Sequence, residues 1–125
     1  MKIVIMADED FEEDIQPLIK EVQAVEQETA FYPIKRKAIQ AGPLLEIIIY
    51  IVKGLEHVML AKILEEGIRW GNAKIQRYRY EPFVITIFGE DGVPLVRKKL
   101  LISGEVEDVP LEKVPKMASI PIHLL

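Results

Sequence analysis

The segment from Pro43 to Trp70, PLLEIIIYIVKGLEHVMLAKILEEGIRW, constrains the fold more than any other part of the chain. At the angular spacing of an α-helix, Glu46, Lys53 and His57 fall on one narrow polar strip in its first half. The polar residues of the second half fall roughly opposite that strip: Lys62, Glu65, Glu66 and Arg69. The pattern predicts one long helix that changes its packing partner midway, with Gly54 allowing a bend.

The first half of this predicted helix carries more apolar surface than a small fold can cover. Its apolar residues are Leu44, Leu45, Ile48, Ile49, Ile51, Val52, Leu55 and Met59. Contiguous apolar patches larger than roughly a few hundred Å² usually mark interaction sites. We therefore expect these residues to bind a second copy of the chain or another protein. The alternative is a core helix, covered by the sheet on one side and by the first helix or the tail on another.

The first third of the chain predicts a strand, a helix and a second strand. Ile3 to Met6 is an apolar run typical of a buried strand, and Thr29 to Ile34 reads as another. Between them an apolar stripe at helical intervals consists of Ile15, Leu18, Ile19, Val22 and Val25, with Pro17 in the first turn. Pro33 fits an edge position or the end of its strand. A right-handed parallel βαβ unit follows from this order.

The later part of the chain predicts a β-hairpin and an irregular tail. Glu81 to Phe88 and Pro94 to Ile102 flank a turn at Gly89 to Gly92. Cations at Arg97, Lys98 and Lys99 indicate a protected edge strand. We thus expect an α+β domain over residues 1–102, with a small mixed four-stranded sheet and two helices. Residues 103–125 are expected to be an extended tail, because its prolines exclude a regular helix.

Composition limits the function classes. The chain has 125 residues and a net charge of −4, which gives no overall attraction to nucleic acid or anionic lipid. Without cysteine there is no disulfide, thiolate nucleophile or cysteine-based metal site. No stretch approaches about eighteen uncharged apolar residues, so we expect no membrane span and a cytoplasmic location.

An acidic cluster follows the first predicted strand: Asp8, Glu9, Asp10, Glu12, Glu13 and Asp14. Asp8, Asp10 and Glu12 match the first alternating ligands of a calcium loop. However, Glu13 stands where that loop needs glycine, and Ile19 stands where it needs a bidentate glutamate. We favour a solvated helix start near the positive end of the helix dipole. A divalent-cation-dependent enzyme or ligand-binding domain remains the alternative.

A basic and aromatic stretch provides the second alternative, nucleic-acid binding. Its residues are Arg69, Trp70, Lys74, Arg77, Tyr78, Arg79 and Tyr80. Aromatic rings between cations could stack on bases while the cations pair with phosphates. The acidic domain opposes this function. We favour aromatic side chains that close the edge of the core, with the cations facing water or the acidic cluster.

The sequence contains few side chains that could act as nucleophiles or bind a catalytic metal. Histidine occurs only at His57 and His123, and serine only at Ser103 and Ser119. No serine stands in a nucleophile elbow, and the histidines form no metal-type pair. We predict no catalytic residue and no cofactor, although carboxylates for acid–base work are plentiful.

The segments AGPLLEIIIYIVKGLEHVMLAKILEEGIRW and VITIFGEDGVPLVRKKL together resemble the effector-associated constant component family, which is found beside predicted bacterial counter-invader systems. That family has a glycine-rich apolar helix, a basic patch and a Gly-x-Asp-Gly turn, which here is Gly89-Glu90-Asp91-Gly92. The resemblance covers residues 1 to about 102, although the helix here has fewer glycines and more charge. It implies a non-enzymatic adaptor that accompanies effector or protease modules, and no catalytic residue is carried over.

Overall fold

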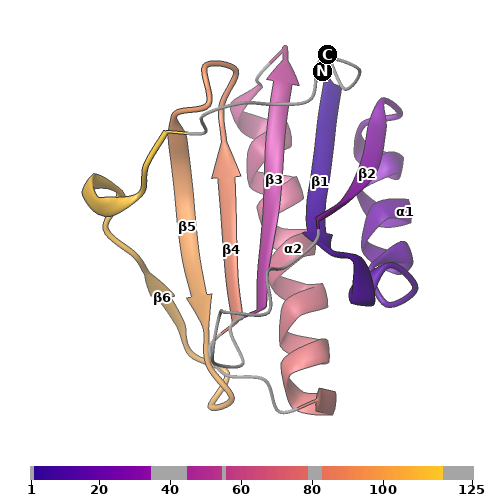
Figure 1. Ribbon diagram of the computed structural model, residues 1–125, viewed down its shortest axis with the longest axis vertical. Coiled ribbons are helices and arrows are strands. Elements are labelled where there is room, and N and C mark those ends of the chain that lie inside the picture. The colour runs from indigo at the N-terminus through magenta and orange to yellow at the C-terminus, as the bar shows by residue number, and fades with distance from the viewer. Residues whose placement is uncertain (1, 35–44, 55, 79–82, 117–125) are drawn as a thin grey trace.

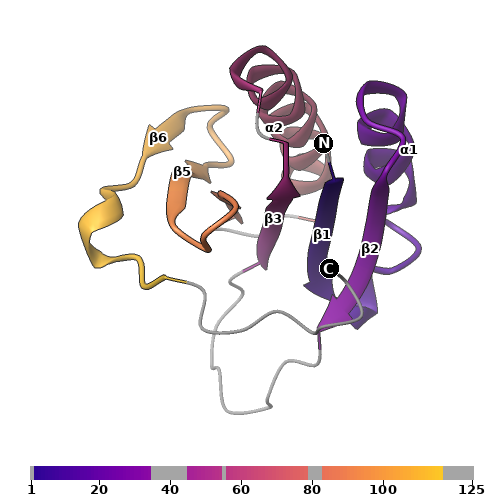
Figure 2. The same ribbon diagram turned by 90° about the horizontal axis from the view of Figure 1, so that it is seen from above.

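The computed structural model describes residues 2–34, 45–54, 56–78 and 83–116, which form one mixed sheet with both helices on the same face (Figures 1 and 2). The sheet has six strands in the order β2-β1-β3-β4-β5-β6. The strands are β1 Lys2–Asp8, β2 Thr29–Ile34, β3 Leu45–Lys53, β4 Phe83–Phe88, β5 Pro94–Leu100 and β6 Val106–Asp108. The helices are α1 Gln16–Val25 and α2 His57–Tyr78, with 3₁₀ turns η1 Glu9–Phe11 and η2 Leu111–Lys113. The α+β class is confirmed, but the predicted four-stranded sheet is wrong.

Two βαβ units build the first four strands. β1 and β2 are parallel neighbours joined through α1, as predicted, and β3 and β4 are parallel neighbours joined through α2. The two units meet at the antiparallel pair β1 and β3, where Ile5 lies opposite Ile49. Each unit therefore covers an edge of the other, because the pair of β1 and β3 lies inside the sheet.

The predicted long helix is wrong in its first half. Residues 45–53 form β3 in the centre of the sheet, and α2 begins only at His57. Gly54 separates the two elements with a φ of 77°, a conformation that favours glycine. Ile47, Ile49 and Ile51 face the helices, while alternate residues face the other side. A strand that is apolar on both faces lacks the alternation that would identify it.

β6 is the second strand that the sequence did not predict, after β3, and it lies in the segment expected to be a tail. β6 pairs antiparallel with β5, with Lys98 opposite Asp108. The predicted edge position of β5 is therefore wrong, since β6 lies outside it. The cations of β5 therefore do not line an exposed edge. Lys98 forms an ion pair with Asp108 of β6, and Arg97 and Lys99 are half-buried.

The sheet is packed on both faces. The main core lies between the helices and the sheet, and it includes Ile5, Leu18, Ile49, Ile63 and Ile85. We call the opposite side the helix-free face. There Val4, Met6, Tyr50, Phe88 and Val114 form a second buried cluster, against which Leu111 packs. The chain after β6 thus contributes to this face as far as it is described. Among the described helices, none combines the length and the hydropathy needed to cross a bilayer.

Candidate association surface

The predicted interface residues do not form one surface. Leu44 and Leu55, and the side chain of Leu45, lie outside the described part of the structure. Ile49 and Ile51 have no exposed surface, because they are in the main core. Ile48 and Val52 are half-buried on the helix-free face, and Met59 is half-buried in the first turn of α2. A partner could therefore reach only part of the predicted set.

The acidic cluster forms a turn at the end of β1. The Asp8 carboxylate accepts a hydrogen bond from the Asp10 backbone N–H at 2.9 Å, which caps η1. Glu12 is exposed, and its backbone carbonyl accepts from the Gln16 side chain at 3.0 Å. Within residues 2–34, 45–54, 56–78 and 83–116, no three His, Cys, Asp or Glu side chains gather as a metal site would require. The contacts seen in the cluster thus include the cap of η1 by Asp8 and the bond from Gln16 to the Glu12 backbone.

The basic and aromatic stretch contacts the chain just before α1. Trp70 is nearly buried, lies edge-on to Phe83 with ring centroids 5.7 Å apart, and donates its Nε1–H to the Asp14 carbonyl at 3.1 Å. Lys74 Nζ lies 3.4 Å from the Asp14 carboxylate and 5.9 Å from the Trp70 ring centre. Trp70 and Lys74 therefore join α2 to the start of α1.

The remaining cations of that stretch are two arginines of α2 and Arg79. Arg69 pairs with Glu65 and Glu66 of its own helix, at 3.5 and 3.2 Å. Arg77 is exposed in the last turn of α2, and Arg79 lies outside the described residues. Between the helices is a cleft of about 240 Å³, lined by Pro17, Leu18, Glu21, Glu66, Arg69, Trp70 and Ala73. It is smaller than most small-molecule sites, which measure about 300–1,000 Å³.

A buried tyrosine holds the β4–β5 hairpin against β3. The Tyr50 hydroxyl donates to the Glu90 backbone carbonyl at 2.7 Å, and the Gly54 N–H donates to the Glu90 carboxylate at 2.7 Å. Burial of the phenol raises the pKa of Tyr50 above its ordinary value of 10.0, and the carboxylates of Asp91 and Glu90 raise this pKa further. These contacts are structural, and they fix the hairpin at one end of the sheet.

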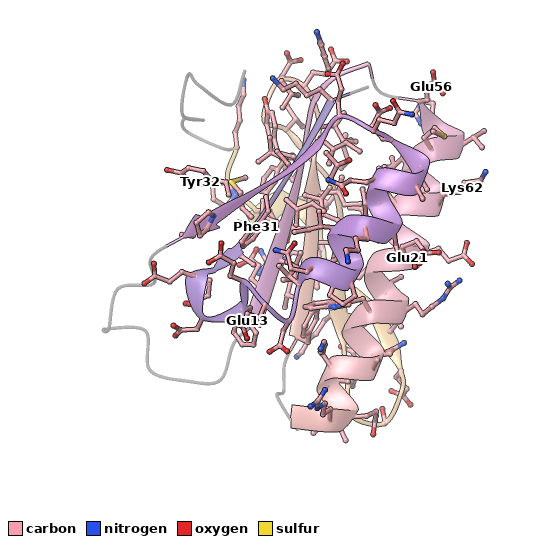
Figure 3. The ribbon with its side chains drawn as sticks, turned by 90° about the vertical axis from the view of Figure 1, so that its right-hand side faces the viewer. Glu13, Glu21, Phe31, Tyr32, Glu56 and Lys62 are labelled. Atoms are coloured by element: carbon pink, nitrogen blue, oxygen red, sulfur yellow. The ribbon has the colours of Figure 1, made fainter. Side chains whose placement is uncertain are left out.

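The two edges of the sheet differ in length and charge. β6 has three exposed residues, two of which are the carboxylates Glu107 and Asp108. β2 has six residues, TAFYPI, and none is charged. Figure 3 shows Phe31 and Tyr32 of β2 on opposite sides of the sheet. Phe31 packs against the main core, and Tyr32 and Ile34 pack against the second cluster.

Within the described chain, β2 has a neighbouring strand on one side only, β1, and we call its other side the open edge. The backbone of β2 presents alternate residues to this edge. The Ile3 N–H donates to the Glu28 carbonyl at 2.8 Å, and Ile3 lies opposite Thr29. In a parallel ladder with this register, Ala30, Tyr32 and Ile34 direct their backbone groups toward β1. Thr29, Phe31 and Pro33 therefore direct theirs outward. The sequence indicated an edge position or a strand end for Pro33, and the structure places it in an edge strand, one residue before its end. The sequence did not identify this strand as a site.

The chain matches no family model, and no curated protein or solved structure is found to be similar to it.

Proposed function

We propose that this chain is a self-associating module that uses the open edge of β2. The main support is the difference between the two edge strands: β2 has six residues and no charge, whereas β6 at the opposite edge is short and acidic. Natural edge strands are commonly protected by charge, by shortness or by proline. β2 has only Pro33, and its outward backbone groups can pair with another strand.

The side chains of β2 support the same function. Phe31, Tyr32 and Ile34 are half-buried in the single chain, so each retains apolar surface that a neighbouring strand would cover. Aromatic anchors commonly contribute most of the binding energy of an interface. The surface differs from the one expected within residues 44–59, because β3 is already paired on both sides.

Neither alternative function is favoured by a described contact. The Asp8 carboxylate is engaged in capping η1, and Arg69 and Lys74 are ion-paired within the chain. The family resemblance implies an adaptor, and an association module is compatible with that role.

Sedimentation equilibrium tests this proposal with a matched pair of variants, Phe31→Pro and Phe31→Ala. Both lose the aromatic ring, but only the proline removes the outward N–H. Proline is tolerated at an edge position whose N–H faces solvent, so the bond ladder to β1 is kept in both variants. We expect the wild type to form a dimer as its concentration rises, and Phe31→Pro to dimerise markedly less than Phe31→Ala. A wild type that stays monomeric at several hundred micromolar, or equal dimerisation of both variants, contradicts the proposal.

A further inference from the structure

From the hydrogen-bonding pattern of β2 we infer that two copies of this chain pair β2 against β2, antiparallel, about a two-fold axis at Phe31. The inference rests on the proposed self-association and adds its geometry. The result is a continuous sheet that runs through both copies, with the helices of both on the same face.

The outward backbone groups of β2 are not all available. The Thr29 carbonyl already accepts a hydrogen bond from the Gln23 side chain at 3.1 Å. Pro33 has no N–H to donate. Of the three outward residues, the groups left are the N–H of Thr29, both groups of Phe31 and the carbonyl of Pro33. Within the described part of the chain, no residue forms a hydrogen bond with these groups.

A two-fold axis at Phe31 matches these groups to one another. In an antiparallel pair, directly opposite residues of the hydrogen-bonded type exchange both backbone bonds. Phe31 then pairs with Phe31 of the second copy, and the two residues exchange two bonds. Thr29 lies opposite Pro33 of the second copy and donates its N–H to that carbonyl. In this pair, a residue other than proline at position 33 would donate its N–H to the Thr29 carbonyl of the other copy. Pro33 cannot do so, but that carbonyl already accepts a hydrogen bond from Gln23.

Other registers lose this match. A shift that places Phe31 opposite Pro33 leaves the Phe31 carbonyl without a donor, because proline supplies none. A shift that places Phe31 opposite Thr29 makes the Thr29 carbonyl accept a second hydrogen bond beside the one from Gln23. It also places Pro33 opposite residue 27, which lies outside β2, so the Pro33 carbonyl loses its partner in the strand. Unpaired backbone groups at a covered edge are costly, so the two-fold register at Phe31 is favoured.

The side chains fit the same arrangement. On the helix-free face, Ala30 lies opposite Tyr32 of the second copy as a pair of the non-hydrogen-bonded type. Ala30 is exposed and small, which leaves room for the tyrosine ring. Because β2 has no charged residue, the two-fold axis brings no like charges directly opposite each other within the strand.

Cysteine cross-linking tests the register, and the natural chain has no cysteine to interfere. Ala30→Cys and Tyr32→Cys chains are prepared separately, mixed and mildly oxidised. Directly opposite residues of this type have Cα atoms about 4.5 Å apart, within the range that a disulfide spans. Residue 30 in one copy and residue 30 in the other are diagonal, about 7–8 Å apart, which is too far. We therefore expect the mixture to cross-link roughly tenfold faster than either variant alone.

The outcomes separate the register from the proposed function. Faster cross-linking of Ala30→Cys alone, or no cross-linking in a chain that sediments as a dimer, overturns the two-fold register while self-association stands. A wild type that sediments as a monomer overturns both. If Tyr32→Cys fails to fold, the pair Thr29→Cys and Pro33→Cys tests the same register, since these residues are also directly opposite.

Discussion

At the scale of single residues, two glycines of α2 predict opposite effects of the same substitution. A Cβ at Gly71 would lie 2.5 Å from Leu100 Cδ1 and 2.9 Å from Phe83 Cε1, and both neighbours are fully buried. A Cβ at Gly67 would meet Ile85 Cδ1 at 3.4 Å, an ordinary contact. We expect Gly71→Ala to lower the free energy of unfolding by about 1–2 kcal/mol, because overpacking exceeds the gain in helix propensity.

Gly67→Ala is the matched control for that change. It should raise the free energy of unfolding by about 0.5–1 kcal/mol, the gain from replacing glycine in a helix interior. Urea denaturation at neutral pH measures both values. Equal effects of the two substitutions would mean that Leu100 and Phe83 yield space at Gly71, contrary to their burial.

Tyr50 gives a prediction that depends on pH. Tyr50→Phe removes the hydrogen bond to the Glu90 carbonyl, and we expect a loss of about 1–2 kcal/mol at neutral pH. Since the folded chain raises the pKa of Tyr50 above 10.0, the unfolded chain ionises first as the pH rises. The stability contributed by this phenol is therefore complete below pH 10 and is lost above it.

Urea midpoints of the wild type and Tyr50→Phe measure this dependence between neutral pH and the highest pH at which both fold. The difference between the two proteins should shrink above pH 10, because only the wild type loses this contribution. The other tyrosines are common to both proteins and cancel in the comparison. A constant difference would contradict a raised pKa.

At the scale of secondary-structure elements, periodicity identified the elements that have one buried face. α1 buries Leu18, Ile19 and Val22 and exposes its opposite side, so its stripe was visible in the sequence. β2 was predicted with the bounds that the structure shows. β3 was missed because both its faces are covered. The available signal was its content of β-branched residues, which favours a strand over a helix. The shift of the polar strip near Gly54 marked the boundary between two elements.

β6 and the candidate edge were beyond sequence reasoning for different physical reasons. β6 has no buried face, and backbone bonds to β5 hold its three exposed residues in the sheet. The edge depends on register: which groups of β2 point outward is decided by the pairing of Thr29 with Ile3 and by the Gln23 contact. The spacing of residues along the chain specifies neither the strand register nor the Gln23 contact.

The segment after β6 gives a prediction at this scale. Val114 is 9% exposed in the second cluster, whereas Val106 in β6 is 41% exposed. Val114→Ala should lower the free energy of unfolding by about 1–2 kcal/mol, through lost apolar burial. Val106→Ala makes the same chemical change and should stay within about 0.5 kcal/mol. Urea denaturation compares the two, and equal losses would mean that η2 and Val114 do not stabilise the helix-free face.

At the scale of the whole molecule, the two βαβ units form one cooperative body. The main core draws residues from both helices and from strands of both units, so separating the units would expose it to water. β1 and β3 also pair at the junction of the units. We therefore expect a single unfolding transition, without a state in which one unit is folded alone.

The single tryptophan reports on this junction directly. Trp70 belongs to the second unit, and its indole donates to Asp14, which precedes the helix of the first. Its fluorescence therefore changes when the units separate, whereas far-UV circular dichroism follows the loss of secondary structure. In urea, at protein concentrations low enough to keep the chain monomeric, the two signals should give coincident midpoints and slopes. A fluorescence transition at lower urea than the dichroism transition would show that the units come apart before they unfold, and that the core between them is weaker than its burial implies.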